Sequence, residues 1–477
     1  MTINDIDVSA TLKEAREQLA EDKSISPGTR SLMNVMILII TLMAGRLGLN
    51  SSNSSKPPSH DPNRKKNPRK KTGKKPGGQK GHVGSKLDKV DNPDVVEVIE
   101  LDRRSLPKGN YREVGHETRQ VFDIQISRVV TEYKAQILEN EKGERFVAQF
   151  PKGVTQTVQY GAGVKAHAVY MSQFQLLPYD RIKDYFADQM GFPLSVGSLF
   201  NFNKKAYEAL ESFETIAKLK LIEAVLAHAD ETGINVNGNR LWLHCFSNDL
   251  WTILFPHEKR GSEAMDEFGI LPNFKGTLCH DHWKPYYRYL CLHALCNAHH
   301  IRELIYAFEQ DKQKWAELMK ELLEEINIKT IESGGVLNNY MQQKFRQDYR
   351  KILIEGEKEC PPPNEKRKKG QRGRIKKSKS RNLLERLRDF EDDTLRFMTM
   401  EVVPFTNNRG EQDIRMTKVQ QKVSGCFRSF EGAKFFCRIR SYLSTCRKHN
   451  ISPTTALEIL FQGKLPDFDS NIQTSAE

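Results

Sequence analysis

Residues 91–150 alternate between apolar and polar side chains, as in V-V-E-V-I-E-L and Q-V-F-D-I-Q-I. A period of two is typical of strands that bury one face, so this stretch predicts a small β-rich module. Residues 31–49 instead place apolar side chains at helical spacing, after an acidic, helix-prone segment at 9–22. We expect residues 31–49 to form a helix that packs against the protein or mediates dimerisation.

The region from Ala224 onward combines short apolar runs with strong turn signals. A strand is predicted to end at Asp230, and Asn237-Gly238 is the pair typical of a type I′ hairpin turn. The remaining elements are expected as strands at 241–245, 251–255, 277–281 and 292–297, a short helix at 261–268, and helices from near His299, through 310–400 and over 407–423. The order is therefore three antiparallel strands, a helix, a fourth strand that ends at Asp281, and a candidate fifth.

Residues 159–218 predict helices, two of which are separated by Gly191, Pro193 and Ser195. A helix, a short turn with glycine and a second helix make the outline of a helix-turn-helix motif that reads DNA. An ordinary helical hairpin would give the same pattern, so both interpretations stay open.

Seven segments follow from these patterns. They are an N-terminal helical or dimerisation segment (1–50), a flexible basic arm (51–90), the β-rich module (91–155), the helix-turn-helix-like segment (156–220), the first part of an α/β core (221–310), a helical insertion with a basic loop (311–400), and the second part of the core with C-terminal helices (401–477). A chain of 477 residues is too long for one ordinary domain.

Positive charge is concentrated in two places. The chain has 74 Lys and Arg against 61 Asp and Glu, a net charge of +13. Residues 56–86 and 366–381 each carry +10, so the rest of the chain sums to −7. Such basic segments point to a polyanionic partner, nucleic acid before membrane. The apolar run at 32–44 has 13 residues, which we interpret as too short to cross a bilayer, and it lies too far from Met1 for a secretory signal.

Basic side chains that we expect to contact DNA phosphates occur in the arm and on the helix that follows Glu411. They are Lys65, Lys66, Arg69, Lys70, Lys71, Lys74, Lys75, Arg415, Lys418 and Lys422. The alternative is that the arm is a solubilising linker and that the helix carries an ordinary solvated face.

Asp230, Asp281 and Glu411 are the candidates for a shared metal site. Transfer of a DNA phosphodiester needs neutralised phosphate charge, an activated oxygen nucleophile and a stabilised leaving oxygen, which two Mg²⁺ ions supply together. Mg²⁺ prefers oxygen ligands and keeps several waters, so a few carboxylates on adjacent strands and a facing helix suffice. The competing interpretation is that strand-end aspartates cap turns and that Glu411 pairs with Arg415 four residues later.

The cysteines and histidines suggest less. Eight cysteines, none before Cys245, lack the spacing of a disulfide scaffold, so we expect reduced thiols in a cytosolic protein. Cys296 and His299 resemble half of a zinc site, but no second Cys/His pair has suitable spacing, and buried structural roles are favoured. No G-x-x-x-x-G-K-[ST] loop indicates ATP use.

Longer ordered motifs resemble the insertion-sequence-66 family of bacterial transposases. They are H-A-D-E-T-G (228–233), L-P-N-F-K-G-T-L-C-H-D-H-W-K-P-Y (271–286), L-C-N-A-H-H-I-R-E-L (295–304) and N-N-R-G-E-Q-D-I-R-M-T-K-V-Q-Q-K-V-S-G-C-F-R-S (407–429), with matching stretches in the arm and in L-L-P-Y-D-R-I. The resemblance covers about residues 47–460.

The resemblance implies a DDE transposase with a ribonuclease-H-like catalytic core, a mixed sheet flanked by helices. Asp230, Asp281 and Glu411 would then be the catalytic carboxylates, with Glu231 and Asp413 as non-catalytic neighbours. Two Mg²⁺ ions are the expected cofactors, with Mn²⁺ able to substitute, and we expect no zinc. The implied partners are double-stranded DNA at element ends and targets, further copies of the chain and small accessory proteins, in the nucleoid of a bacterial cytoplasm without membrane contact.

Two departures from the family pattern stand out. Residues 91–150 contain no cysteine, whereas members often carry a zinc-finger-like module there. Gly410 stands where the resemblance predicts alanine, and glycine in a helix costs roughly 1 kcal/mol relative to alanine. Metal-dependent cleavage at element ends with strand transfer is the main hypothesis. The alternatives are a non-catalytic DNA-binding protein derived from a transposase and a structure-selective nuclease.

Overall fold

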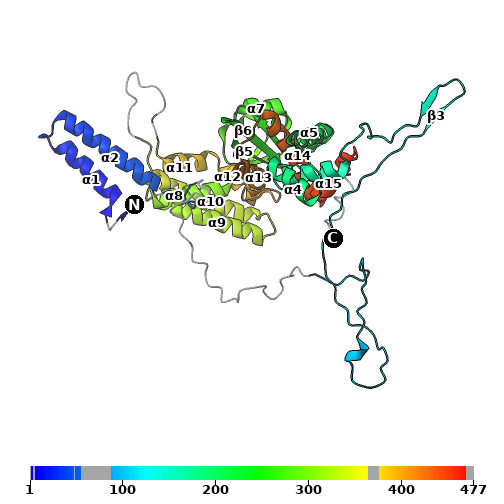
Figure 1. Ribbon diagram of the computed structural model, residues 1–477. Helices are drawn as coiled ribbons and strands as arrows, with labels where there is room; N and C mark the ends of the chain where they lie inside the picture. The colour runs from blue at the N-terminus through cyan, green and yellow to red at the C-terminus, as the bar shows by residue number, and fades with distance from the viewer. Residues whose placement is uncertain are drawn as a thin grey trace.

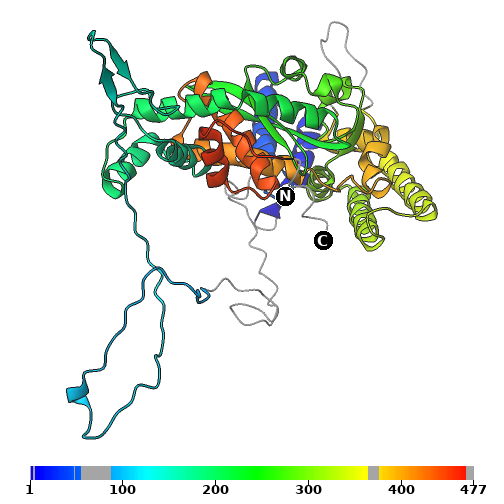
Figure 2. The same cartoon turned by 90° about the vertical axis from the view of Figure 1, so that its right-hand side faces the viewer.

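The protein, a computed structural model, is described here for residues 2–3, 6–47, 49–54, 87–363, 375 and 377–468. It is a multidomain α/β protein with a mixed sheet near its centre and helices on both sides (Figure 1). The long helices of the insertion and the small hairpin at residues 137–147 lie at opposite ends of the body (Figure 2).

The central sheet has five strands in the order β7-β6-β5-β8-β9. Their bounds are β5 Leu226–Val236, β6 Asn239–Ser247, β7 Thr252–His257, β8 Thr277–His280 and β9 Leu292–Leu295. β5, β6 and β7 are antiparallel neighbours, whereas β8 and β9 run parallel to β5. The predicted order of elements is confirmed, but β5 continues past Asp230, which lies inside the strand rather than at its end.

The turn between β5 and β6 follows from two residues. Asn237 and Gly238 have φ angles of 49° and 85°. A type I′ turn needs positive φ at both central positions, which asparagine and glycine tolerate best. The hairpin predicted from Asn-Gly is therefore confirmed, and it sets the register in which Asp230 lies opposite Cys245.

Alternation along the strands gives the sheet two different faces. Ala229 and Phe246 point into the core that the helices of residues 162–222 share with the C-terminal helices. Ile234 and Cys245 point to the other face, where Ile414 packs against them. Since successive side chains in a strand point to opposite faces, Asp230 shares the second face.

The helices around the sheet come from both halves of the chain. Their bounds are α3 Ala162–Val169, α4 Tyr179–Gln189, α5 Val196–Ala209, α6 Glu211–Ile222, α7 Ser262–Phe268, α13 Asn408–Ser424, α14 Phe430–Lys448 and α15 Pro453–Phe461, and a π-helix, Tyr170–Phe174, follows α3. α14 packs along β7, while α13 packs across β5 and β6. α13 thus brings a distant part of the chain to the face that carries Asp230.

α4 and α5 form the outline of a helix-turn-helix. Gly191 has a φ of 69° in the turn, and Ser195 Oγ accepts a hydrogen bond from the Ser198 backbone N–H at 2.9 Å. This N-cap satisfies a backbone donor that the first turn would otherwise leave free. Leu199 and Phe202 anchor α5 in the core. The helical outline is confirmed, whereas DNA reading by it stays a prediction.

The predicted helical insertion is present between β9 and α13. Its helices are α8 Asn297–Glu309, α9 Lys314–Glu332, α10 Asn339–Glu359, α11 Lys379–Asp389 and α12 Glu391–Leu395. They pack in a core of which Trp315, Phe345 and Tyr349 are almost fully buried members, and Cys279 and Ala294 of the sheet join this core. The insertion is therefore continuous with the sheet through α8, and the predicted division at residue 311 stays a prediction.

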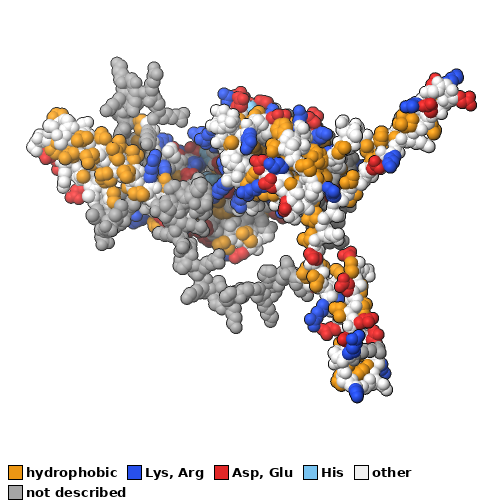
Figure 3. Space-filling view, viewed as in Figure 1, with side chains coloured by type: hydrophobic (Ala, Val, Ile, Leu, Met, Phe, Trp, Pro, Cys, Tyr) orange, Lys and Arg blue, Asp and Glu red, His pale blue; other side chains and the backbone are white. Residues whose placement is uncertain are grey.

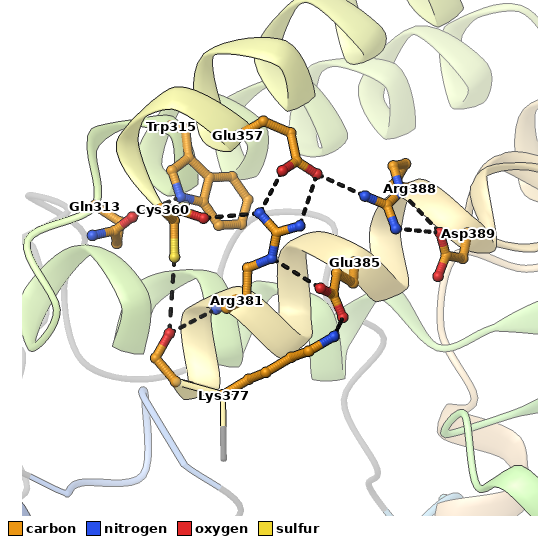
Figure 4. A network of polar contacts seen from close by, with 10 residues as sticks. Gln313, Trp315, Glu357, Cys360, Lys377, Arg381, Glu385, Arg388 and Asp389 are labelled. Carbon is orange, nitrogen blue, oxygen red and sulfur yellow. Dashed lines mark hydrogen bonds and ion pairs between the residues drawn. The ribbon is translucent and has the colours of Figure 1, made fainter. Parts of the chain in front are cut away.

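A buried arginine joins α10 to α11 (Figure 4). Arg381 is 5% exposed and pairs with Glu357 and Glu385, while its guanidinium also donates to the Cys360 carbonyl at 2.9 Å. Residues 364–374 and 376, most of the second basic segment, lie outside the described residues. Of the described remainder, Lys377 pairs with Glu385, so Arg381 and Lys377 serve the insertion itself rather than a free basic surface.

The N-terminal segment forms two packed helices, α1 Val8–Glu21 and α2 Pro27–Leu47. Large hydrophobic side chains on α2, such as Leu38 and Leu42, are exposed. In Figure 3 hydrophobic side chains cover much of the surface of the α1–α2 pair. The sequence-based argument that this region is too short to span a bilayer is wrong, because α2 has 21 residues and enough hydropathy. Glycine, threonine and arginine residues outside the apolar run extend the helix. One such helix near the N-terminus does not by itself indicate a membrane protein.

The β-rich module expected at 91–155 is largely absent from the described structure. It contains one hairpin, β3 Ile137–Glu139 with β4 Arg145–Val147, and all six of its residues are exposed. Apolar side chains before it, such as Ile99 and Val121, are about 91% exposed. Alternation produces a stable sheet only when a second layer covers the apolar face, and no element among the described residues covers this one.

Candidate functional site

Two of the predicted carboxylates lie on neighbouring parallel strands. β5 and β8 pair as Leu226 with Thr277 through His228 with Cys279. If the same register continues for two residues, Asp230 comes level with Asp281, directly after β8. Parallel neighbours in register point side chains to the same face, and strands lie about 4.8 Å apart. The sheet therefore places both aspartates together where the β5–β8 ladder ends.

The third carboxylate reaches the same place from α13. Glu411 lies in the first turn of this helix, whose Ile414 is buried against the sheet face that carries Asp230. The helix starts at the level where β5 and β8 separate, because Asn407 bonds to Ala229 of β5. The three predicted residues thus come from β5, the position directly after β8 and the first turn of α13, and the charges of Asp281 and Glu411 act on Asp230.

The pKa of Asp230 is raised by its burial and by the neighbouring carboxylates. Burial, followed by the negative charges of Glu231 and Asp281, raises the pKa of Asp230 from 3.8 to about 8, and Glu411 adds to the effect. Like charges held together in a partly buried site disfavour ionisation of one another. Without a cation, this cluster therefore retains a proton on Asp230 at neutral pH, and a bound divalent ion would release it.

Stability should depend on pH because of this group. The unfolded chain releases the Asp230 proton near pH 3.8, whereas the folded chain holds it until about pH 8. The stabilisation is thus complete below the lower pKa and is lost as pH rises through the upper one. We expect Asp230→Asn to raise the thermal midpoint of metal-free protein relative to wild type, with a difference that grows between about pH 4 and pH 8. Asp249→Asn, an exposed aspartate, is the control; a pH-independent difference would contradict this origin.

The most compact set of metal-binding atoms is a different one. Among the described residues, Cys296, His299 and Glu411 offer ligand atoms that all lie within 4.8 Å of one another. His299 Nδ1 is 4.0 Å from Glu411 Oε1. Asp230 and Asp281 do not belong to this set. Glu411 therefore lies between two groups, the aspartates of the sheet and the Cys–His pair at the start of α8.

Asn407 connects the elements of the site, although it was not among the residues predicted from the sequence. Its Oδ1 lies 2.7 Å from His228 Nδ1, and its Nδ2 donates to the Ala229 carbonyl at 2.9 Å. Its backbone N–H donates to Cys296 Sγ at 3.1 Å. The side-chain amide of this buried residue thus holds α13 on β5, while its backbone N–H connects α13 to the start of α8. Asparagine at the first position of a predicted helix was the signal that could have identified it.

Asn407→Ala should therefore destabilise the protein and disorder the site. The change leaves a buried imidazole nitrogen and a buried carbonyl without their partner, which costs about 2 kcal/mol. Thermal or urea denaturation measures the loss. Asn408→Ala removes an exposed neighbour of the same type and should change stability by less than about 0.5 kcal/mol. Equal effects of the two substitutions would show that the Asn407 amide holds nothing.

The packing around position 410 explains why glycine is present there. A Cβ at this position would lie 3.2 Å from both Oδ1 and Nδ2 of Asn407. That separation is tighter than ordinary van der Waals contact, so alanine would press on the amide that connects the elements. The glycine accommodates Asn407 against the first turn of α13.

The two neighbouring acids have other partners. Glu231 points to the opposite face from Asp230; its side chain is 1% exposed, pairs with Arg260 and accepts from the Tyr286 hydroxyl at 2.7 Å. Asp413 forms a buried ion pair with Lys448 at 2.7 Å. Both carboxylates thus have structural partners.

The basic candidates divide into two groups. Arg415, Lys418 and Lys422 are exposed on α13 beyond Glu411, and Lys418 Nζ also donates to the Gly233 carbonyl at 2.7 Å. Lys418 thus partly serves to hold α13 on β5. The arm candidates lie outside the described residues: Lys65, Lys66, Arg69, Lys70, Lys71, Lys74 and Lys75. All eight cysteines are free, as predicted.

Comparison with known families found two matches. The profile described as "Transposase IS66 family" matches residues 157–435, which include both aspartates, Glu411 and the Cys–His pair. A family of unknown function (DUF6444) matches residues 30–88. No curated protein matches the chain.

Proposed function

The chain belongs to the IS66 family of transposases, and from this premise we propose that it cuts DNA at the ends of an insertion element and joins those ends to target DNA. The observation that carries the proposal is that Asp230 in β5 carries the charge effects of Asp281, directly after the neighbouring β8, and of Glu411 in the first turn of α13. Strand transfer by this route needs oxygen ligands on rigid elements with an opening for DNA. We further propose that the sheet is a ribonuclease-H-like core, which the strand order supports.

Asp230, Asp281 and Glu411 would hold two Mg²⁺ ions, or Mn²⁺ in their place. The donor set fits, because Mg²⁺ prefers carboxylate oxygen. The neighbouring carboxylates also raise the pKa of Asp230, and a bound cation would neutralise their charge. When bound, the ions would supply phosphate neutralisation, activation of the oxygen nucleophile and stabilisation of the leaving oxygen. The carboxylates position them, and no covalent bond between protein and DNA is required.

The remaining residues would bind and align DNA. Arg415, Lys418 and Lys422 extend along α13 from Glu411 and would contact phosphates next to the cut. The basic arm and the α4–α5 outline would hold the element ends. The exposed apolar face of α2 supports self-association of the chain, and small accessory proteins of the element are further proposed partners. A site in the bacterial nucleoid follows from this function.

The direct test is cleavage and joining of element-end DNA by the full chain with Mg²⁺ or Mn²⁺. Cleaved ends and joined products are expected only with the divalent ion. Specific binding without divalent-dependent cleavage would instead support the alternative of a non-catalytic DNA-binding protein. Cleavage without joining would support a structure-selective nuclease.

DNA binding should be strongly salt-dependent through the arm. Replacing the seven arm candidates by glutamine should flatten the slope of log K against log salt by up to about 6, because each lost phosphate contact removes about 0.9. Fluorescence anisotropy over a salt series measures the slope. The matched change of Arg415 and Lys422 to glutamine should reduce it by about 2 at most. An unchanged slope in the arm variant would make the arm a linker.

A further inference from the structure

The start of α8 and the start of α13 face each other and present three different ligand types. Cys296 is the N-cap of α8, His299 lies in its first turn, and Glu411 lies in the first turn of α13. Their sulfur, nitrogen and oxygen atoms all lie within 4.8 Å of one another. We refer to these three residues as the soft-ligand cluster.

Two atoms of the soft-ligand cluster have unmet bonding capacity. His299 Nδ1 and Glu411 Oε1 are shielded from solvent, and neither has a hydrogen-bond partner. Buried polar atoms nearly always have one, and an orphan calls for a cause such as a bound ion. Their separation of 4.0 Å is too long for a hydrogen bond. Two such ligands on a tetrahedral zinc ion lie about 3.4 Å apart, so a small side-chain rotation would suffice.

The sulfur is prepared as a ligand by the backbone. Cys296 Sγ accepts the Asn407 N–H, and the N–H groups of His299 and Ala298 also favour its thiolate. Burial outweighs them and raises the pKa of the Cys296 thiol. A coordinated cation reverses this balance, because a thiol bound to a metal is deprotonated outright.

We propose that Cys296, His299 and Glu411 form a binding site for a borderline-soft divalent ion such as Zn²⁺ or Co²⁺. Thiolate and imidazole are ligands of these ions, whereas Mg²⁺ takes oxygen ligands. The absence of a second Cys/His pair argued against zinc in the sequence, but the third ligand is a carboxylate more than a hundred residues later. A fourth position remains open for water.

Glu411 belongs to both the soft-ligand cluster and the proposed Mg²⁺ site. An ion held by Cys296 and His299 would draw this carboxylate away from Asp230 and Asp281. A soft ion and Mg²⁺ would therefore compete for Glu411, and binding of the soft ion would inhibit Mg²⁺-dependent DNA cleavage. This last step rests on the proposed function, whereas binding of the soft ion does not.

Titration of the metal-free full chain with Co²⁺, followed by absorption, tests the site. Wild type should bind one equivalent with thiolate-to-cobalt charge-transfer absorption in the near ultraviolet. Cys296→Ser should abolish that absorption, and His299→Ala should weaken binding at least about tenfold, since even outer-shell changes cost that much. Cys291→Ser is the matched control, because Cys291 lies 4.0 Å from His293 in a second Cys–His pair.

The outcomes separate the two proposals. Asp230→Asn should retain the cobalt spectrum whether or not wild type cuts DNA. His299 is 26% exposed, so its alanine variant tests the site even if Cys296→Ser does not fold. Zn²⁺ should displace Co²⁺ at concentrations where Mg²⁺ does not. No thiolate absorption in wild type, or its loss in Cys291→Ser but not in Cys296→Ser, overturns the soft-ion site.

Discussion

Asp230→Asn should lower Mg²⁺-dependent cleavage and joining of element-end DNA by about a thousandfold or more. The amide is a poorer ligand than the carboxylate, and stabilisation of transition-state charge by metal ions amounts to several kcal/mol, at about 1.4 kcal/mol for each factor of ten. Asp230 is central to the cluster because the other acids act on its charge. Rates of cleavage under single-turnover conditions give the measurement.

The appropriate comparison is a carboxylate outside the cluster. Asp249 lies on the turn between β6 and β7, where it pairs with Arg409 at 2.6 Å and is largely exposed. Asp249→Asn should leave cleavage close to wild type, since exposed pairs contribute little. Binding of the same DNA should be intact in both variants. Wild-type rates in Asp230→Asn would remove the catalytic role assigned to this residue.

Arg381→Ala should destabilise the helical insertion by about 2–3 kcal/mol. The substitution leaves Glu357 and the Cys360 carbonyl without the guanidinium that joins α10 to α11 (Figure 4). Glu357 keeps Arg388 and Glu385 keeps Lys377 as partners, so the loss comes mainly from the buried Cys360 carbonyl, which is left without its donor. Native-state hydrogen exchange of α10 and α11 measures this locally, which avoids assuming that the whole chain unfolds in one step.

Arg388→Ala provides the control for this network. Arg388 also pairs with Glu357, but its side chain is 46% exposed. Such pairs contribute about 0–1 kcal/mol. If both substitutions changed exchange rates equally, burial of Arg381 would not be what holds the two helices.

Local signals predicted most of the sheet. The Asn237-Gly238 pair imposed its turn, and the short apolar runs became β6 to β9 because each is confined between turn residues. The module at 91–155 failed for a tertiary reason, since alternation describes a strand with one covered face and says nothing about what covers it. The length of α2 was underestimated because helix formation continued into residues that the apolar run excluded.

The site was predictable only in part. The three carboxylates were identified from motifs, and the register of β5 with β8 explains why two of them meet. The function of Asn407 depends on a carbonyl 178 residues away, a separation at which a single sequence carries no pairing information. The closeness of Glu411 to Cys296 and His299 could not be predicted for the same reason.

The position of α13 in the chain affects when the site comes into existence. All five strands are complete at Leu295, but α13 begins only at Asn408, after the whole insertion. At synthesis rates of about 5–20 residues per second, the ribosome needs roughly 6–20 s to cover that interval. A nascent chain would therefore hold both aspartates before Glu411, Asn407 and the helices α13 and α14 that cover the sheet are made. The site should therefore be completed late in translation. Chains that end within the insertion should neither cleave nor join DNA.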